Sequence, residues 1–180
     1  MLERLFKSRT LPNAPLAMVG AKPGNRVLVI GTRFPGLAAQ LARATGLNGQ
    51  TVVLGAEADR TAVEAAAASA GALIEFRPRE ESAIAPGPEP FDVAVATYPL
   101  AGLSDTEQAR LIGDAFAAIR PGGRVIVVDG GSSPGLIWRV PARAIDAPKV
   151  LKLLTAGGGL AVRALGSVDN ITYYEARKNR

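Results

Sequence analysis

The sequence predicts an α/β fold, a doubly wound and mostly parallel seven-stranded sheet with helices on both faces and an antiparallel last strand. Short aliphatic runs that stop near glycine are typical of strands buried on both faces of a sheet. These runs alternate five times with helix-length segments before two closing strands. With 180 residues, 48% of them hydrophobic, the chain is long enough for one such domain. We expect an N-terminal segment over residues 1–20 and a single domain over residues 21–180.

The first half of the chain is expected to supply three strands and two helices. The predicted strands are residues 26–31, 51–54 and 72–76, and the predicted helices are residues 37–43 and the alanine-rich stretch that ends at Gly71. Either Asp59 or Thr61 can cap the second helix, and Thr61 and Glu64 have the spacing of a capping box. Residues 1–20 are expected to begin with a short helix.

The second half begins after a proline-rich loop at residues 78–90. A capping box at Ser104 and Glu107 opens an amphipathic helix, which Pro121-Gly122-Gly123 is expected to stop. The remaining predicted elements are strands at 91–96, 124–129, 160–165 and 171–176, a helix near 148–155 and a turn at 166–170.

Two missing residue types exclude much chemistry. The chain has no cysteine, which excludes disulfides, thiolate metal sites and a cysteine nucleophile. It has no histidine either, which removes the most common general base, the most common metal ligand and any Ser-His-Asp triad. Any proton transfer therefore falls to a carboxylate, lysine, tyrosine, water or the substrate itself.

The net charge of +5 is unevenly distributed along the chain. Residues 1–52 carry +6, residues 53–119 carry −7 and residues 120–180 carry +6, and 16 of the 21 basic residues are arginine. Such a surface is compatible with an anionic partner, although an arginine-rich solvated surface explains it equally. Because no basic cluster is interleaved with aromatic residues, nucleic acid is not favoured as a partner. No apolar stretch reaches the roughly 20 residues of a membrane-spanning helix, and we expect a cytoplasmic protein.

Glycines follow the first two predicted strands, at the sheet edge where doubly wound proteins bind ligands. The loop from Gly31 to Gly36 leads into a helix whose free amide groups favour a carboxylate or phosphate. The second strand ends in Gly55-Ala56-Glu57, and an acidic residue there can accept hydrogen bonds from both ribose hydroxyls. A core turn and a surface glutamate would explain these residues equally well.

Six segments together resemble the class I S-adenosylmethionine-dependent methyltransferases over roughly residues 20–178. They are VLVIGTRFPG at 27–36, VVLGAEAD at 52–59, EFRPRE at 75–80, FDVAVATYPL at 91–100, AFAAIRPGGRVIVVD at 115–129 and ITYYEARK at 171–178. The helix, Arg-Pro-Gly-Gly-Arg and aliphatic strand of the fifth segment are especially typical of the family. The resemblance implies a Rossmann-like methyltransferase fold and S-adenosylmethionine as the cofactor.

The resemblance also assigns roles to residues. It makes Gly31, Thr32, Arg33 and Gly36 cofactor-binding residues of the first motif, with Arg33 near the methionine part. It places Glu57 at the ribose and Glu80 at the adenine amino group. It also makes Ala58 a cofactor-binding residue, as well as Thr97 in the loop after the fourth strand, which faces the cofactor. If methyl transfer needs a base, Tyr98 and Asp129 are the candidates. The alternative is structural: Tyr98 packs over the sheet edge and Asp129 caps a turn.

The glycine-rich first motif departs from the family pattern. Val29 occupies the position of the usual acidic residue, Arg33 stands near the second glycine, and Gly36 comes one residue late. Arg33 would either pair with the cofactor carboxylate or block the pocket.

Two hypotheses therefore remain. The first is a methyltransferase acting on a small molecule, anionic or aromatic if Trp138, Arg139 and Arg143 form a lid, although Trp138 can equally be a structural anchor. The second is an inactive methyltransferase-like domain that binds a ligand or a protein. A nucleotide-binding oxidoreductase is disfavoured, and the absence of an Asn/Asp-Pro-Pro-aromatic signature after the fourth strand argues against methylation of exocyclic amines. We expect a monomer or a homodimer and no metal.

Overall fold

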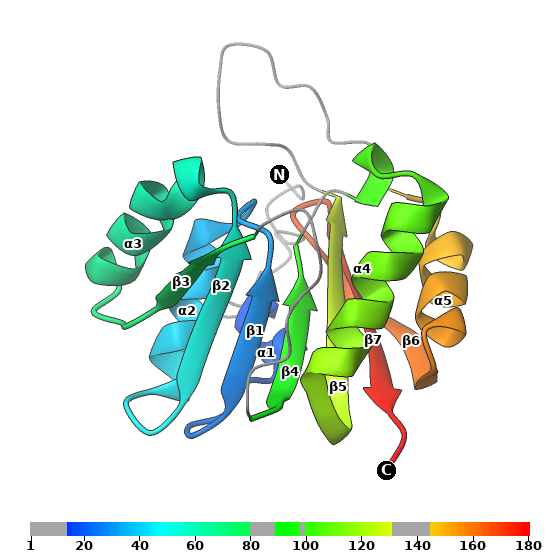
Figure 1. The fold of residues 1–180 in the computed structure, drawn as a ribbon, viewed down its shortest axis with the longest axis horizontal. Coiled ribbons are helices and arrows are strands. Elements are labelled where there is room, and N and C mark those ends of the chain that lie inside the picture. Colours follow the sequence, from blue (N-terminus) through cyan, green and yellow to red (C-terminus); the bar gives the residue numbers. More distant parts are fainter. Residues whose placement is uncertain (1–13, 80–88, 98–99, 131–144) are drawn as a thin grey trace, which may run out of the picture.

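The fold is a single seven-stranded sheet in the order β3-β2-β1-β4-β5-β7-β6 (Figure 1). A computed structural model describes residues 14–79, 89–97, 100–130 and 145–180. The strands are β1 Arg26–Ile30, β2 Gln50–Gly55, β3 Glu75–Pro78, β4 Phe91–Ala96, β5 Ile119–Gly130, β6 Gly159–Val168 and β7 Ile171–Lys178. The first five strands are parallel, and β7 runs antiparallel to both of its neighbours, β5 and β6. The predicted fold class is confirmed.

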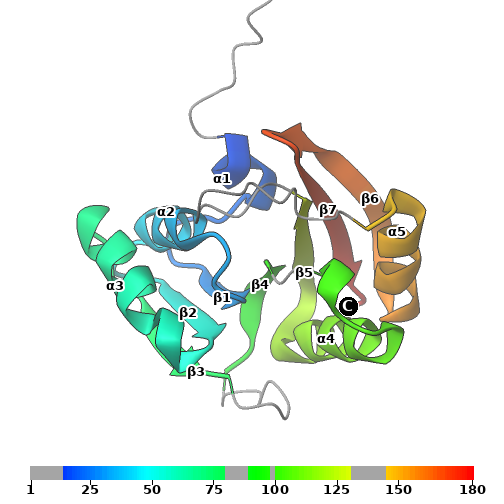
Figure 2. The same ribbon diagram turned by 90° about the horizontal axis from the view of Figure 1, so that it is seen from above.

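Helices cover both faces of this sheet (Figure 2). The helical elements are α1 Ala14–Val19, α2 Pro35–Thr45, the 3-10 turn η1 Glu57–Asp59, α3 Arg60–Ser69, the 3-10 turn η2 Leu100–Gly102, α4 Asp105–Ala118 and α5 Ala147–Ala156. The first three α-helices lie on one face, and α4 and α5 lie on the other. No helix of the described residues is long and apolar enough to cross a membrane. The boundary that we expect at residue 20 stays a prediction.

The core consists of two hydrophobic clusters, one on each face of the sheet. Leu28 and Ile30 of β1 pack in the cluster under α4 and α5, whereas Val27 and Val29 pack in the cluster under α2. Successive strand residues point to opposite faces, so a strand covered on both sides needs an unbroken aliphatic run. This is the physical reason why the central strands can be predicted from the sequence.

Two predictions in the first half of the chain are wrong. The capping box at Thr61 and Glu64 does not form, because η1 leads the chain into α3 one residue earlier and Thr61 lies inside the helix. Asp59 is the N-cap residue, but its side chain makes no capping hydrogen bond. Strand β3 lies at 75–78 rather than 72–76, since it pairs only with β2 and its register is set by that pairing.

In the second half, the capping box at Ser104 and Glu107 is confirmed. The expected helix stop at Pro121 is wrong, because α4 already ends at Ala118 and β5 begins at Ile119. Ile119 pairs with Phe91 and Arg124 pairs with Val93, so residues 120–123 bulge opposite the single residue Asp92. The last turn is also shorter than expected, since β6 and β7 are joined by Asp169 and Asn170, both with positive φ.

Candidate functional site

The carboxyl ends of the parallel strands form one edge of the sheet, at the top of Figure 1. The predicted residues that follow these ends are Gly31, Thr32, Arg33, Gly36, Glu57, Ala58 and Thr97, and Asp129 is the last residue but one of β5. Glu80 and Tyr98 lie outside the described residues, as do Trp138, Arg139 and Arg143. The edge therefore brings together residues separated by almost one hundred positions in the sequence.

The loop after β1 turns sharply at Gly31. Its φ of +104° lies in the region that favours glycine, and its N–H donates to the carbonyl of Leu54 on β2. Helix α2 then begins with Pro35, and no side chain caps its first turn. Gly36 is exposed and a side chain there would meet open space. The turn and the uncapped helix start together favour a negatively charged group at this edge.

Thr32 joins this loop to the segment that follows β2. Its Oγ1 donates to Asp59 Oδ2 at 2.5 Å, and its methyl carbon occupies the space where a side chain on Gly55 would lie. The hydroxyl of Thr32 and the carboxylate of Asp59 thus hold together two loops that are 27 residues apart. Neither the pairing nor the reason for Gly55 is visible in the sequence.

Replacing Gly55 with alanine is expected to destabilise the protein by about 1–3 kcal/mol, the cost of forcing an extra methyl group into a packed site. The new methyl would displace the Thr32 side chain and break its hydrogen bond to Asp59. Chemical denaturation measures the loss. Gly71→Ala is not a clean control because φ is +63° there, but Gly113→Ala, with open space around it, should cost nothing. Equal stability of both variants with the wild type would contradict the packing described here.

Glu57 is an exposed carboxylate in η1, directly after the end of β2. Arg60 donates to both of its oxygens, from Nε to Oε1 at 2.6 Å and from Nη2 to Oε2 at 2.9 Å. The hydrogen bonds from Arg60 lower the pKa of Glu57 below its ordinary value. The guanidinium of Arg60 also lies over the ring of Phe76, 4.7 Å from its centre. Since an ionised carboxylate accepts about four hydrogen bonds, Glu57 is oriented by Arg60 and still able to accept others.

Thr97 and Asp129 are both buried, each with 1% of its surface exposed. Thr97 follows β4, and its hydroxyl donates to the carbonyl of Gly31 at 2.9 Å, which fixes the ends of β1 and β4 together. Asp129 accepts a hydrogen bond from the N–H of Ile145 on Oδ2 at 2.7 Å, while its Oδ1 has no partner in the described part of the chain. Burial raises the pKa of Tyr174, and the charge of Asp129 raises it further.

Val29 and Arg33, the two residues that depart from the family pattern in the first motif, each contact identified side chains. Val29 has 1% of its surface exposed and packs in the cluster under α2, so an apolar side chain fills this position. The guanidinium of Arg33 lies over the ring of Phe34, 5.2 Å from its centre. Arg33 therefore contacts the N-cap residue of α2 and lies in the same loop as Gly31.

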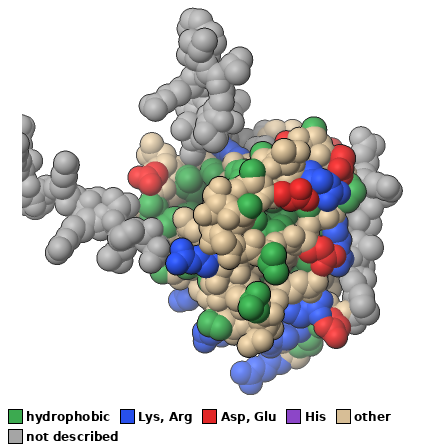
Figure 3. Space-filling view, turned by 90° about the vertical axis from the view of Figure 1, so that its left-hand side faces the viewer, with side chains coloured by type: hydrophobic (Ala, Val, Ile, Leu, Met, Phe, Trp, Pro, Cys, Tyr) green, Lys and Arg blue, Asp and Glu red, His purple; other side chains and the backbone are tan. Residues whose placement is uncertain are grey.

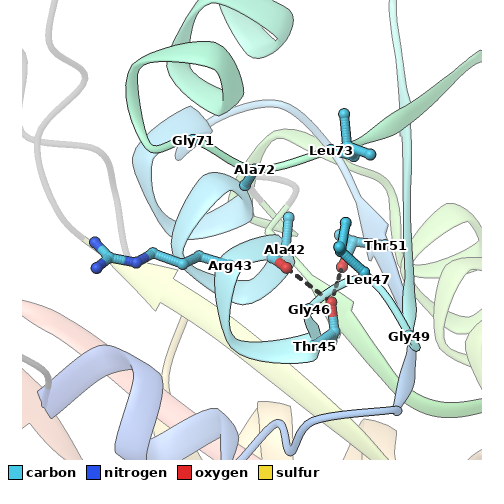
Figure 4. A pocket seen from close by; sticks show the side chains of 10 residues that line it. All are labelled: Ala42, Arg43, Thr45, Gly46, Leu47, Gly49, Thr51, Gly71, Ala72 and Leu73. Carbon is cyan, nitrogen blue, oxygen red and sulfur yellow. Dashed lines mark hydrogen bonds between the residues drawn. The ribbon is translucent and has the colours of Figure 1, made fainter.

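A pocket of about 160 Å³ lies at the opposite end of the sheet, beside the start of β2 (Figure 4). The hydroxyls of Thr45 and Thr51 hydrogen-bond across it at 3.2 Å, and Arg43 points away from it. Two nearby leucines, Leu47 and Leu73, are exposed, but the hydrophobic side chains on this side form separate groups rather than one patch (Figure 3). This pocket therefore offers no titratable group for catalysis.

Comparisons with known proteins show the fold. No family model matches the chain, and no curated protein matches it. Among solved structures, it is similar to a SAM-dependent methyltransferase from Aquifex aeolicus, with a TM-score of 0.73, 18% identity, and coverage of 91% of this chain and 89% of that chain. The apo form of the S-adenosylmethionine-dependent methyltransferase SibL matches with a TM-score of 0.65 and 20% identity, over 87% of this chain and 51% of that chain. The [4+2]-cyclase SpnF matches with a TM-score of 0.65 and 18% identity, over 92% of this chain and 79% of that chain.

The chain thus has the fold of S-adenosylmethionine-dependent methyltransferases, as the sequence resemblance implies. It spans about half the length of SibL. The presence of a cyclase among these structures means that the fold alone does not determine the reaction.

Proposed function

We propose that the chain binds S-adenosylmethionine at the carboxyl edge of β1 and β2 and transfers its methyl group to a small-molecule acceptor. One observation carries the proposal: an exposed and oriented carboxylate, Glu57, lies one strand away from a positive-φ glycine turn at Gly31. The hydrogen bond between Thr32 and Asp59 holds these two loops in place before any ligand arrives. The cytoplasmic location stays a prediction.

The residues at this edge fit the cofactor. Glu57 would accept hydrogen bonds from the ribose hydroxyls, with Ala58 beside it in η1. The turn at Gly31 lets the backbone approach a ligand closely, and the start of α2 at Gly36 would face the methionine carboxylate. Arg33 would add a positive charge for that carboxylate, and Glu80 is proposed for the adenine amino group.

When bound, S-adenosylmethionine supplies an activated methyl group on its sulfonium. The protein then has only to orient the acceptor and exclude water, which is compatible with a chain lacking histidine and cysteine. Thr97 contributes by fixing the ends of β1 and β4. Asp129 Oδ1 is a buried oxygen at the same edge without a partner among the described residues, and we propose that it accepts a proton or hydrogen bond from the acceptor. Tyr98 is the alternative base.

Calorimetric titration with S-adenosylmethionine and S-adenosylhomocysteine tests the proposal. We expect saturable 1:1 binding with a micromolar Kd for both ligands. An absence of heat, together with no thermal shift at millimolar ligand, would rule out the enzyme. Binding followed by failure to methylate any acceptor would leave the second candidate function, a ligand- or protein-binding module without transferase activity. The apolar Val29 at the usual acid position is the observation that favours this second candidate.

Replacement of Arg33 with alanine separates the two roles open to this residue. If Arg33 binds the methionine carboxylate, the variant should bind S-adenosylhomocysteine about tenfold more weakly, the loss expected for one charge-assisted hydrogen bond. Affinity for 5′-methylthioadenosine, which lacks the carboxylate, should be unchanged. Arg43→Ala, at the far end of the same helix, is the matched control. Tighter binding of S-adenosylhomocysteine by the Arg33 variant would show instead that Arg33 blocks the pocket.

A further inference from the structure

A second cavity, of about 370 Å³, lies at the amino end of the sheet, opposite the proposed cofactor edge. It is formed by the loop before β1, the start of β4, the bulge in β5 and the end of β7. Four positively charged side chains line it, those of Lys22, Arg120, Arg124 and Arg177. The carboxylate of Asp92 lines it as well. Lys and Arg side chains also gather at the lower end of the face in Figure 3, which is the same end of the sheet.

Among the described residues that line the cavity, the one carboxylate, Asp92, already accepts two hydrogen bonds. Asp92 accepts the backbone N–H of Arg26 on Oδ2 at 2.8 Å and Nε of Arg120 on Oδ1 at 2.7 Å. Burial alone would raise the pKa of Asp92, but these two interactions outweigh it and lower the pKa. Asp92 thus remains ionised, and within the described residues its salt bridge is with Arg120.

Arg124 is compensated as well. Its Nη1 donates to Glu175 at 3.0 Å, and its Nη2 donates to the carbonyls of Val19 and Gly20. Lys22 and Arg177 are different, since neither forms a salt bridge within the described ranges of the chain. The cavity therefore holds two uncompensated positive charges.

Arg177 is exposed, and its position places it beside a second arginine. Arg177 lies directly opposite Arg124 in the antiparallel pairing of β5 with β7, so both side chains stand on the same face. Like charges directly opposite each other destabilise a sheet. Glu175, two residues along β7 on that face, binds Arg124 and Arg163 but not Arg177.

We propose that this cavity binds the phosphate group of a small phosphorylated ligand. Arginine presents a planar fork of donors that matches phosphate oxygens, and Lys22, which also lines the cavity, adds a point charge. Gly122 of the bulge also lines the cavity, and its φ of +74° lies in the region that favours glycine. A volume of 370 Å³ fits a small molecule, since ligand pockets span about 300–1,000 Å³.

Inorganic pyrophosphate is the probe, titrated calorimetrically into the full chain at low ionic strength, where charge interactions are least screened. We expect saturable 1:1 binding that weakens at least tenfold in the double variant Lys22→Ala/Arg177→Ala. The control is Arg43→Ala/Lys152→Ala, which removes the same charge from exposed positions outside the cavity. It should change the Kd by less than twofold. Thermal unfolding of both variants checks that they fold.

Four outcomes would overturn the proposal, three in direct titration and one in competition. The first is no saturable binding. The second is equal weakening in the control, which would indicate a diffuse charge effect. The third is tight binding of single-stranded oligonucleotides, with an affinity that increases with their length and with no displacement by pyrophosphate. That result would make nucleic acid the source of the phosphate. A competition arm separates this cavity from the cofactor edge, because saturating S-adenosylhomocysteine should leave pyrophosphate binding unchanged. Displacement would place pyrophosphate at the start of α2 and contradict the assignment.

Discussion

Replacement of Glu175 with alanine is expected to lower the free energy of unfolding by about 3 kcal/mol, as for removal of one partner from a buried ion pair. Only 3% of the Glu175 side chain is exposed, and it accepts hydrogen bonds from Arg124 at 3.0 Å and from Arg163 at 2.8 Å. Its loss would leave Arg124 uncompensated beside Arg177. This loss lies at the low end of the range of about 3–5 kcal/mol for breaking a buried ion pair, because Arg163 is mostly exposed. Urea denaturation measures the effect.

The dependence of this effect on pH follows from the pKa of Glu175. Burial alone would raise that pKa, but the hydrogen bonds from Arg124 and Arg163 outweigh it and hold the pKa below its ordinary value. The carboxylate therefore stabilises the folded state fully above the unfolded-state pKa, and this contribution is lost as the pH falls through the folded-state pKa. The stability difference between wild type and Glu175→Gln should shrink below about pH 4. A difference that stays constant from pH 7 to pH 3 would contradict the ion-pair account.

Replacement of Glu57 with glutamine is expected to weaken S-adenosylmethionine binding by about 10- to 100-fold, since hydrogen bonds to a charged group contribute about 1.5–3 kcal/mol each. Glutamine keeps the size of the side chain but removes the charge and one acceptor. It also loses the bidentate contact with Arg60 that orients the side chain. Calorimetric titration gives the ratio of Kd values.

The matched control is Glu64→Gln on α3. Glu64 is also exposed and also contacts Arg60, at 3.4 Å, but it lies one helical turn further from the edge of the sheet. Its replacement should change the Kd by less than twofold. Equal losses in both variants would mean that the charge of Arg60, and not a contact from Glu57, controls affinity.

The sequence is most informative where burial on two faces forces a residue type. The runs that begin at Val27, Val52 and Val125 lie in strands covered by helices, so the consecutive residues of each run are buried and apolar. The capping box can also be predicted from the sequence, because its two residues, Ser104 and Glu107, lie within one helical turn of each other. These local signals are sufficient to place most strands along the chain and the glycine turn at Gly31, whereas the order of the strands in the sheet comes from the structure.

What the sequence does not reveal depends on contacts between distant residues. The bulge opposite Asp92 exists because β5 pairs with β4 on both sides of it, and no local motif marks that pairing. The hydrogen bond from Thr32 to Asp59 and that from Thr97 to Gly31 each join different loops. The pairing of Glu57 with Arg60 is the exception, since their spacing of three residues is a visible signal.

A nitrogen–proton NMR titration with S-adenosylhomocysteine tests the central claim most directly, because it reports where the ligand binds. The account predicts saturable shifts of the amide signals of Gly31, Gly36 and Ala58, with little change at Lys22 and Gly122 at the other end of the sheet. Shifts confined to that other end, or no saturable shift at any residue, would contradict a cofactor site at the carboxyl edge of β1 and β2.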